Sequence, residues 1–371
     1  MSVSVIVAGG GTGGHLFPGV AVARELLARV PGATVTFVGT AAGIESRVIP
    51  REGLTLETIR SAGLKGKSPV ALLRGLLLLP LSALDAWRVI SRTQPAVVIG
   101  VGGYSSGPVV ALAALRGIST LLMEQNAMPG ITNRTLARLV RSAAVTYEES
   151  IPFFGAKAFV SGNPVRPEFF QEAYDDHGSP PGAARVLVFG GSQGAHAINV
   201  AMVEAAPRLA SATPRLAITH QTGERDLELV RDGYRRAGLE ARVEPFLFAM
   251  DREIKAADLV VCRAGATTIA ELTAAGRPAV LVPLPTAADD HQRKNAEVLG
   301  AAGAAEVVEQ TDLQGGSLAA RIQALINTPD RLATMAAAAR KLARPDAVRV
   351  IADKAIELMK DKDPGKSAWS Y

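Results

Sequence analysis

The sequence predicts an α/β fold in which two similar parallel-sheet domains face each other across a cleft. Residues 3–8 form a strand-type run that leads into a glycine-rich turn at residues 9–14 and then into a helix-type segment. The second half of the chain repeats this pattern, with a strand-type run at residues 185–189 and a glycine-rich turn at residues 190–195. Strand-type and helix-type segments alternate throughout, which is typical of a parallel sheet. At each turn, backbone N–H groups at a helix start favour a bound anion.

The expected elements follow in order through both halves. Strands of the first half are expected at residues 3–8, 34–38, 97–100, 120–124 and 143–146. Strands of the second half are expected at residues 186–189, 216–221, 242–244, 259–262 and 279–282. Helices are expected between them, for example at residues 19–29, 131–140 and 266–275. Residues 162–167 contain two prolines and no periodic pattern, so they are the expected linker between the domains.

Length and composition fit a globular protein of two domains. The 371 residues are 48% hydrophobic and 20% charged, and a chain of this length is long for a single core. The formal net charge of +5 permits attraction to an anionic ligand or lipid but does not indicate a nucleic-acid-binding protein. The single cysteine, Cys262, excludes an intramolecular disulfide and a cysteine-rich metal site, and it fits a reducing cytosol. The first residues lack the pattern of an export signal.

The first glycine-rich turn matches G-x-G-x-x-G at Gly9, Gly11 and Gly14, so a dinucleotide-binding dehydrogenase is an alternative. Such a protein needs an acidic residue near the end of the second strand to bind the ribose. Here no acidic residue follows that strand until Glu45, and His15 lies where the helix would begin with apolar residues. These departures make dinucleotide binding the less favoured interpretation.

The second turn matches G-x-S-x-G around Ser192, which would suit the nucleophile of a serine hydrolase. Asp258 and His291 follow in the order that a catalytic triad would need. The first half, however, has an equivalent turn without a serine. A duplicated binding element explains both turns, whereas a single nucleophile explains only one of them.

Residues 70–81 are the most hydrophobic stretch of the chain. A helix needs about 20 apolar residues to span a bilayer, so this stretch is too short to cross one. Two interpretations stay open. The stretch is either a helix of the core or an interfacial helix whose neighbours Lys65, Lys67 and Arg74 meet anionic lipid headgroups.

Further clusters of glycine and polar residues lie at the predicted strand ends. In the first half these are residues 100–108 and 124–126. In the second half, residues 262–271 open a helix whose carboxylate, Glu271, is placed to accept hydrogen bonds from two vicinal hydroxyls, as in ribose binding. The polar run at residues 289–295 would, taken alone, be a solvated helix start with an aspartate cap.

These clusters follow one another in a specific order along the chain. They comprise residues 10–15 (GGTGGH), 102–104 (GGY), 124–126 (EQN), 162–166 (GNPVR), 190–194 (GGSQG), 220–223 (HQTG) and 263–266 (RAGA). Each motif alone is unspecific, but all seven in this order resemble the MurG family, bacterial N-acetylglucosaminyltransferases of peptidoglycan synthesis. The resemblance extends from the first strand to about residue 295.

The resemblance implies a GT-B glycosyltransferase fold of two Rossmann-like domains. Residues 1–162 would form the domain that binds the acceptor and the membrane, and residues 163–340 the domain that binds UDP-N-acetylglucosamine. Residues 341–371 would form a C-terminal helix that returns toward the first domain.

The implied reaction transfers N-acetylglucosamine from UDP-N-acetylglucosamine, with inversion, to the C4 hydroxyl of the muramic sugar of lipid I, which gives lipid II. The implied enzyme is a peripheral protein at the cytoplasmic face of the bacterial cell membrane. Its implied partners are the donor, lipid I, the anionic membrane surface and other cell-wall synthesis proteins, and nucleic acid is not among them. The apolar and basic stretch from Lys65 to Leu84 matches the membrane-facing patch of the family in position and character.

The resemblance also implies roles for individual residues. The implied donor site comprises Thr12, Gly13, Gly14, Asn126, Arg166, Ser192, Leu247, Ala266, Thr267, Thr268, Ile269, Ala270, Glu271 and Gln292. In it, Glu271 would bind the ribose hydroxyls, Gln292 the sugar hydroxyls and the backbone of Leu247 the uracil. The implied acceptor-side and catalytic residues are His15, Tyr104 and Glu124. The general base is either His15, an imidazole at the mouth of the first glycine-rich turn, or Glu124, a carboxylate at the end of a predicted strand.

Inversion at the anomeric carbon is one in-line displacement, which needs a base and a site for the charge of the departing UDP. No Asp-x-Asp motif follows a predicted strand, so no essential metal and no tightly bound cofactor are expected. The helix starts after Gly191 and Gly265, together with Arg166, would stabilise the diphosphate instead.

Two positions depart from the family pattern. Ala264 stands where the family often has serine, so one side-chain contact near the diphosphate would be missing. His291 and Gln292 stand where some members have two glutamines. Two alternatives remain: another UDP-sugar-dependent glycolipid glycosyltransferase, and a non-catalytic nucleotide-sugar-binding protein, which would not need the acceptor-side residues.

Overall fold

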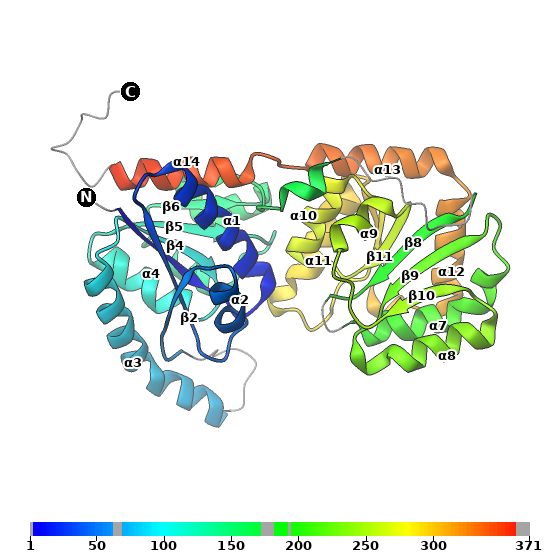
Figure 1. The fold of residues 1–371 in the computed structure, drawn as a ribbon, viewed down its shortest axis with the longest axis horizontal. Helices are drawn as coiled ribbons and strands as arrows, with labels where there is room; N and C mark the ends of the chain where they lie inside the picture. The colour runs from blue at the N-terminus through cyan, green and yellow to red at the C-terminus, as the bar shows by residue number, and fades with distance from the viewer. Residues whose placement is uncertain (1–2, 62–68, 172–181, 192–193, 361–371) are drawn as a thin grey trace. The chain divides into compact units, whose positions relative to one another are not determined.

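The computed structural model describes residues 3–61, 69–171, 182–191 and 194–360, with the backbone alone for residues 69–77. The chain folds into two compact units (Figure 1). Unit 1 comprises Met1–Val165 and Asp346–Tyr371, and unit 2 comprises Arg166–Pro345. The chain therefore passes from one unit to the other twice, at Val165 and at Pro345.

Among the described residues, unit 1 contains a seven-stranded parallel sheet with the strand order β3-β2-β1-β4-β5-β6-β7. The strands are β1 (Ser4–Gly9), β2 (Thr34–Gly39), β3 (Thr55–Thr58), β4 (Val97–Gly102), β5 (Ser119–Glu124), β6 (Ser142–Val145) and β7 (Ala158–Val160). The central strands β4 and β5 are buried along their whole length, because helices cover both faces of a parallel sheet. The pairing of β1 with β4 shifts register between Ala8 and Gly9, where the first glycine-rich turn begins.

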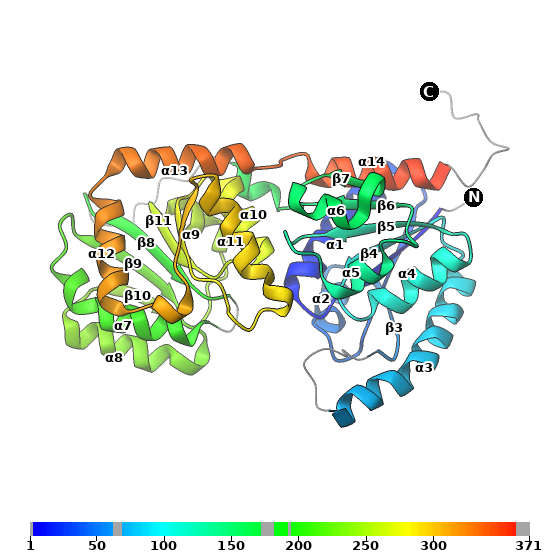
Figure 2. The ribbon, with the colours of Figure 1, turned by 180° about the vertical axis from the view of Figure 1, so that it is seen from behind.

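Two apolar clusters lie on opposite faces of this sheet. The helices of unit 1 are α1 (Gly13–Arg29), α2 (Glu45–Arg51), α3 (Pro69–Thr93), α4 (Ser106–Leu115), α5 (Ile131–Leu136), α6 (Ile151–Phe154) and α14 (Ala347–Lys360), with 3-10 turns η1 (Glu148–Ser150) and η2 (Gly155–Lys157). One cluster contains side chains of α1, α2 and α14. The other contains side chains of α3, α4, α5 and α6, and α3 runs beside α4 (Figure 2).

The last described helix, α14, completes the core of unit 1. Its residues Ile351, Ala352 and Ala355 are buried in the same apolar cluster as α1. At the surface of this contact, Arg29 forms an ion pair of 2.5 Å with Asp353. Segments far apart in the sequence therefore form one hydrophobic core.

Unit 2 contains a six-stranded parallel sheet, in the residues described, with the order β10-β9-β8-β11-β12-β13. Its strands are β8 (Ala184–Phe189), β9 (Leu216–Gln221), β10 (Ala241–Glu244), β11 (Leu259–Cys262), β12 (Ala279–Leu281) and β13 (Ala305–Val307). Its helices are α7 (His196–Ala210), α8 (Leu227–Ala237), α9 (Met250–Ala256), α10 (Ala266–Ala275), α11 (His291–Ala301), α12 (Gly315–Ile326) and α13 (Pro329–Leu342). The 3-10 turns are η3 (Pro167–Phe170), η4 (Glu224–Asp226), η5 (Ala288–Asp290) and η6 (Gln310–Asp312). The main core lies between the sheet and α7, α8 and α12.

The sequence predicted the two parallel α/β sheets and their central strands. It missed β3, β7 and β13, each of which lies at the edge of its sheet. Helix α1 begins at Gly13, six residues before the predicted start, and α5 ends at Leu136 and not at residue 140. The predicted helix at residues 266–275 has the bounds of α10.

Candidate functional site

Each sheet reverses its strand order at one place. In unit 1 the reversal lies between β1 and β4, and in unit 2 it lies between β8 and β11. Doubly wound sheets bind ligands at this place, outside the carboxyl ends of the strands. The first glycine-rich turn, called the first loop (residues 9–14), follows β1, and the second loop (residues 190–195) follows β8. The motifs at residues 102–104 and 263–266 follow β4 and β11, so each unit brings two predicted motifs together.

The first loop lies directly against the loop that follows β4. The Gly10 N–H donates to the carbonyl of Gly102 at 3.3 Å. A Cβ on Gly9 would overlap that carbonyl, and a Cβ on Gly103 would lie 2.5 Å from the carbonyl oxygen of Gly10. Gly9 and Gly103 have φ angles of 139° and 84°. Both positions therefore require glycine, for space and for backbone conformation.

His15 lies in the first turn of α1 and is half-buried. Its Nδ1 is 3.3 Å from the hydroxyl of Thr12. Its ring edge lies beside Gly102, where a Cβ would be 3.0 Å from His15 Cδ2 and 3.2 Å from Nε2. Tyr104, two residues further on, is 52% exposed. Unit 1 thus places two of the predicted acceptor-side residues at adjoining loops.

Glu124, the other candidate base, ends β5 and is buried. One carboxylate oxygen accepts hydrogen bonds from the backbone N–H and the side-chain amide of Asn126, at 3.0 and 3.2 Å. The other oxygen accepts from the Gly130 N–H at 3.1 Å and from the amide of Asn133 at 2.8 Å. Burial raises the pKa of Glu124 above its ordinary value, although these hydrogen bonds oppose the rise. Both oxygens are engaged in holding the segment between β5 and α5.

The second loop lies on the end of β9. Ser192, a predicted donor contact, is outside the described residues. Gly194 has a φ of 72°, and a Cβ there would overlap the carbonyl oxygen of Thr222. The loop therefore packs on the β9 end through backbone contact alone at this position.

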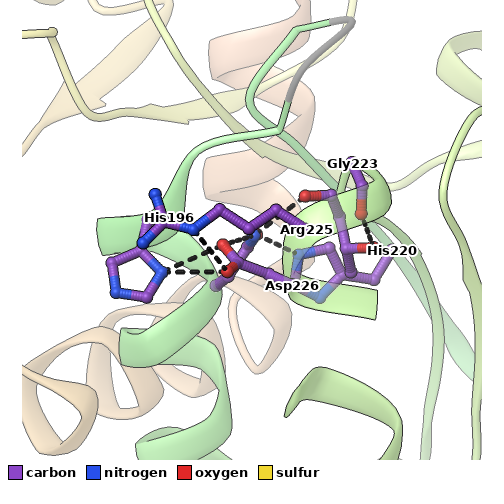
Figure 3. Close-up of polar contacts among 7 residues, drawn as sticks. His196, His220, Gly223, Arg225 and Asp226 are labelled. Carbon is purple, nitrogen blue, oxygen red and sulfur yellow. Dashed lines mark hydrogen bonds and ion pairs between the residues drawn. The ribbon is translucent and has the colours of Figure 1, made fainter. Parts of the chain in front are cut away.

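Behind this contact lies a group of hydrogen-bonded polar side chains that includes His196, His220 and Asp226 (Figure 3). The Asn199 amide donates to the Thr222 carbonyl at 2.9 Å and to Asp226 at 2.8 Å, and its oxygen is 3.0 Å from His220 Nε2. His196 Nδ1 lies 3.0 Å from Asp226 Oδ2. Burial lowers the pKa of His220 to about 3, so this imidazole is neutral at physiological pH. Burial also raises the pKa of Asp226, but hydrogen bonds from Asn199 and His196 outweigh it and lower the pKa overall.

Gln221, the last residue of β9, connects the second loop with the segment after β10. Its amide nitrogen donates to the Gly191 carbonyl at 2.8 Å, and its amide oxygen accepts from the Leu247 N–H at 2.8 Å. Leu247 is buried, and the rings of its chain neighbours Phe246 and Phe248 pack edge to face with centroids 5.0 Å apart. Phe248 itself is 92% exposed. One side chain therefore fixes both the loop and the predicted uracil-binding backbone.

Helix α10 begins with Ala266–Glu271, six of the fourteen predicted donor residues. The first N–H groups of a helix have no partner within it, which favours an anion at the start of α10. Among the described residues, the buried Thr267 hydroxyl has no hydrogen-bond partner. Burial raises the pKa of Glu271, one turn on, to about 7, with Arg166 opposing the rise and Asp251 adding to it. The helix thus combines an unpartnered hydroxyl with a carboxyl group that titrates near neutrality.

The two remaining donor candidates of unit 2, Arg166 and Gln292, each contact a neighbouring group of the protein. The guanidinium of Arg166 lies 5.1 Å from the ring centroid of Phe169. Gln292, in the first turn of α11, accepts a hydrogen bond from the Leu284 N–H at 3.0 Å through its amide oxygen. Its neighbour His291 has Nδ1 2.6 Å from the Ala288 carbonyl. The Gln292 amide is therefore oriented by the backbone.

Comparison with known proteins decides the family. The descriptions "Glycosyltransferase family 28 N-terminal domain" and "Glycosyltransferase family 28 C-terminal domain" match residues 5–145 and 185–351. A protein of Anaeromyxobacter dehalogenans named UDP-N-acetylglucosamine--N-acetylmuramyl-(pentapeptide) pyrophosphoryl-undecaprenol N-acetylglucosamine transferase is 49% identical over 357 residues, 96% of this chain and 93% of that protein. The protein of the same name from Myxococcus xanthus is 47% identical over 358 residues, again 96% and 93% of the two chains. The crystal structure of Acinetobacter baumannii MurG matches with a TM-score of 0.78 at 32% identity, over 96% of this chain and 99% of that one.

The chain belongs to the MurG family. Membership confirms the family predicted from the seven ordered motifs, and with it the GT-B fold. The chain is a glycosyltransferase, and the dehydrogenase and hydrolase alternatives no longer stand.

Two residues that shape the loops were not predicted as members of the MurG site. The sequence places Glu45 too far from the second strand to bind a ribose, and it includes Gln221 only within the motif at residues 220–223. In the structure, Glu45 opens α2 and accepts a hydrogen bond from the first loop. Its place at the start of the helix that follows β2 was the available signal, but its partner lies 34 residues earlier in the chain.

The described part of the chain contains no group of three or more His, Cys, Asp or Glu side chains placed to hold a metal ion. Of the helices described, none is both long enough and apolar enough to cross a membrane.

Helix α3 carries an apolar surface, called the α3 patch, that consists of Leu79, Leu81, Leu84 and Trp87. These side chains are between 38% and 50% exposed, and the guanidinium of Arg116 lies 4.5 Å from the centroid of the Trp87 ring. Ala86, Val89 and Ile90 of the same helix are buried in the core of unit 1. Lys65, Lys67 and the side chain of Arg74, which were predicted to meet lipid headgroups, lie outside the described residues.

Proposed function

We propose that this glycosyltransferase moves N-acetylglucosamine from UDP-N-acetylglucosamine to the C4 hydroxyl of the muramic sugar of lipid I, with inversion, to form lipid II. The observation that carries the proposal is the 47–49% identity, over 96% of the chain, to proteins whose names state this transfer. The two glycine-rich loops and the motifs at residues 102–104 and 263–266 lie at the switch points of the two sheets, which supports it further.

The proposed donor site of unit 2 is built around α10. Glu271 would accept hydrogen bonds from the ribose hydroxyls, and the Thr267 hydroxyl, which is buried without a partner among the described residues, would gain one from the donor. Since the Leu247 N–H already donates to Gln221, we assign the Leu247 carbonyl to the N–H of uracil. The donor contacts assigned to Thr12, Gly13, Gly14, Asn126 and Gln292 stay predictions.

The proposed general base is His15. A base needs an atom that reaches the acceptor hydroxyl, and both carboxylate oxygens of Glu124 are already engaged by buried donors. The acceptor oxygen would form the new bond to the anomeric carbon while the bond from that carbon to UDP breaks. His15 would take the hydroxyl proton. Glu124 would instead hold the segment that carries Asn126, and Tyr104 would contact the acceptor.

The negative charge of the departing UDP would be stabilised by the start of α10, by the second loop and by Arg166. Aligned N–H groups and a guanidinium supply positive charge without a metal ion. We therefore expect turnover to persist in EDTA. Loss of turnover in EDTA that magnesium restores would contradict this part of the proposal.

We further propose that the enzyme is peripheral to the cytoplasmic face of the cell membrane, with the α3 patch against anionic lipid. The acceptor is lipid-linked, and exposed leucines beside a tryptophan and arginines are typical of interfacial helices. Association with other cell-wall synthesis proteins stays a prediction.

The test is a transfer assay with purified protein, labelled UDP-N-acetylglucosamine and lipid I in the presence of EDTA. We expect lipid II as product and little transfer from the C4 epimer, UDP-N-acetylgalactosamine. Transfer to a diacylglycerol lipid but not to lipid I would favour another glycolipid glycosyltransferase. Donor binding without transfer to any acceptor would favour a binding protein.

A further inference from the structure

Glu45 is a buried carboxylate that the proposed chemistry does not use. It is the first residue of α2 and is only 1% exposed. A buried carboxylate needs hydrogen-bond donors on both oxygens to offset its lost hydration. The hydrogen-bond donors around Glu45 therefore indicate the role of this carboxylate in unit 1.

Both oxygens of Glu45 have donors, and one of these belongs to the first loop. Oε2 accepts from the Gly11 N–H at 2.8 Å. Oε1 accepts from the backbone N–H and the hydroxyl of Thr40, at 2.8 and 2.9 Å. The carboxylate thus connects the end of β2 with the loop that follows β1.

Three glycines leave the space that this carboxylate occupies. A Cβ on Gly10 would lie 2.5 Å from Glu45 Oε2, and Cβ atoms on Gly39 and Gly43 would overlap the Glu45 side chain. Burial alone would raise the pKa of Glu45, but the N–H donors of Gly11 and Thr40 outweigh it and lower the pKa overall. The group is therefore an anion at neutral pH.

This arrangement changes the interpretation of the first loop. The sequence predicted that both glycine-rich loops direct N–H groups at a bound anion. In the first loop the Gly10 N–H donates to Gly102 and the Gly11 N–H donates to Glu45. A side chain of the protein thus supplies the anion for Gly11.

From Gly11 the connection continues to the proposed base. The next residue, Thr12, is the N-cap of α1, and its hydroxyl lies 3.3 Å from His15 Nδ1. The His15 ring lies beside Gly102, whose carbonyl accepts from Gly10. A displacement of Gly11 would therefore disturb Thr12 and, through Gly10, the Gly102 backbone beside the imidazole.

We propose that Glu45 is a positioning residue that acts as the built-in anion of the first loop and holds Thr12 and His15 in place for acceptor activation. This inference rests on the proposed function, because it assigns Glu45 to the proposed base. Its carboxylate is buried and accepts hydrogen bonds from Gly11 and Thr40, so its effect would act through the loop.

The test compares Glu45→Gln with Thr40→Ala. Glutamine keeps the shape of the side chain but replaces one acceptor oxygen with an N–H₂ group, which opposes either Gly11 or Thr40. Thr40→Ala removes one hydrogen bond to the other oxygen and leaves the Gly11 bond intact, so it is the matched control. For each variant we would measure kcat, KM for lipid I, the Kd of UDP, the Tm and the pH profile of kcat/KM.

We expect Glu45→Gln to lower kcat about 10- to 100-fold, since small misplacements of a catalytic group have effects of this size. The Kd of UDP should stay unchanged, and the limb of the pH profile that reports His15 should shift. Thr40→Ala should keep kcat within about twofold of wild type, because the loop bond remains. If Glu45→Gln does not fold, Gly43→Ala displaces the same carboxylate without removing its charge and should give the same pattern.

A folded Glu45→Gln variant with wild-type kcat and an unchanged pH profile would overturn the inference. So would equal losses of kcat in Glu45→Gln and Thr40→Ala that only follow the fall in Tm. Absence of lipid II formation by the wild-type enzyme would contradict the proposed function instead, so the two failures are distinguishable.

Discussion

The two glycine-rich loops follow equivalent strands of two similar sheets, yet side chains of different charge hold them. In unit 1 the ionised carboxylate of Glu45 accepts from an N–H of the first loop. In unit 2 the neutral amide of Gln221 donates to a carbonyl of the second loop. Glu45 therefore engages an N–H group of the first loop, which is the kind of group that binds an anion. Gln221 engages a carbonyl group of the second loop instead.

This difference shows that a repeated motif predicts a repeated backbone and not a repeated ligand. A carboxylate beside the first loop opposes a second anion there by charge repulsion. The second loop has a neutral support, which is compatible with the diphosphate proposed for unit 2. The glycines are common to both loops. The charge of the side chain that contacts each loop therefore indicates whether the loop binds a carboxylate of the protein or a ligand.

The largest expected effect separates the two units by function. His15→Ala should lower kcat on the order of 10²- to 10⁴-fold, because a general base contributes about this much. The Kd of UDP should stay unchanged, since the contacts proposed for its uracil, ribose and diphosphate belong to unit 2. Steady-state kinetics and calorimetry of UDP binding measure the two quantities. Weaker UDP binding with unchanged kcat would assign His15 to the donor site. It would also contradict the division between acceptor activation by unit 1 and UDP binding by unit 2.

The next effect concerns Glu271. Glu271→Gln should weaken UDP binding roughly 10- to 100-fold, because hydrogen bonds to a charged group are worth about 1.5–3 kcal/mol. The carboxylate form accepts from the ribose hydroxyls and the pKa is about 7. Wild-type affinity should therefore rise as the pH increases through this value and should be nearly flat with pH in the variant. A pH dependence that persists in Glu271→Gln would assign it to another group.

A smaller effect is expected at Gln221, and two variants sharpen the contrast between the loops. Gln221→Leu leaves the Gly191 carbonyl and the Leu247 N–H without their partner and should weaken UDP binding about tenfold. Gln221→Glu places a carboxylate beside the second loop, as Glu45 does beside the first loop. This variant should weaken UDP binding further, because the carboxylate repels the diphosphate. Titration calorimetry with UDP tests the order. Tighter binding by Gln221→Glu than by Gln221→Leu would mean that the charge of the support does not matter.

The smallest effect is on acid stability. The pKa of Glu45 is below its ordinary value of 4.5 in the folded state, so its ionised form stabilises unit 1. This contribution is complete above the unfolded pKa and is lost as the pH falls through the lower folded pKa. The difference in Tm between wild type and Glu45→Gln should therefore be constant near neutral pH and shrink in acid. A difference that does not change with pH would show that shape, and not charge, sets the stability.

The sequence was sufficient for the central strands and for the edge strand β10, and insufficient for the other three edge strands. Strands β4 and β5 are buried along their length, so β4 appears as an unbroken run without polar side chains and β5 has an apolar centre at Leu121, Leu122 and Met123. Strands β3, β7 and β13 are short and mostly half-buried or exposed, so they carry no such run. The early start of α1 was hidden because its first turns contain glycines and a proline, which are typical of loops.

The candidate site also has a part that the sequence predicts and a part that it does not. Glycine turns, His15 and the α10 residues belong to short contiguous motifs, so their place at strand ends follows from the sequence. The contacts of Glu45 with Gly11 and of Gln221 with Leu247 join residues 34 and 26 positions apart. Such contacts depend on the packing of neighbouring strands, which periodicity and spacing do not report.

The return of α14 has a consequence for the order in which the protein folds during synthesis. Unit 2 is one continuous segment that ends at Pro345, whereas unit 1 needs Asp346–Tyr371 as well as the first residues of the chain. While α14 is still within the ribosome, the apolar surface of α1 that will contact Ile351 and Ala355 is uncovered. The first unit to emerge is therefore the last to complete its core, and a nascent chain that stops at Pro345 would present that surface to chaperones.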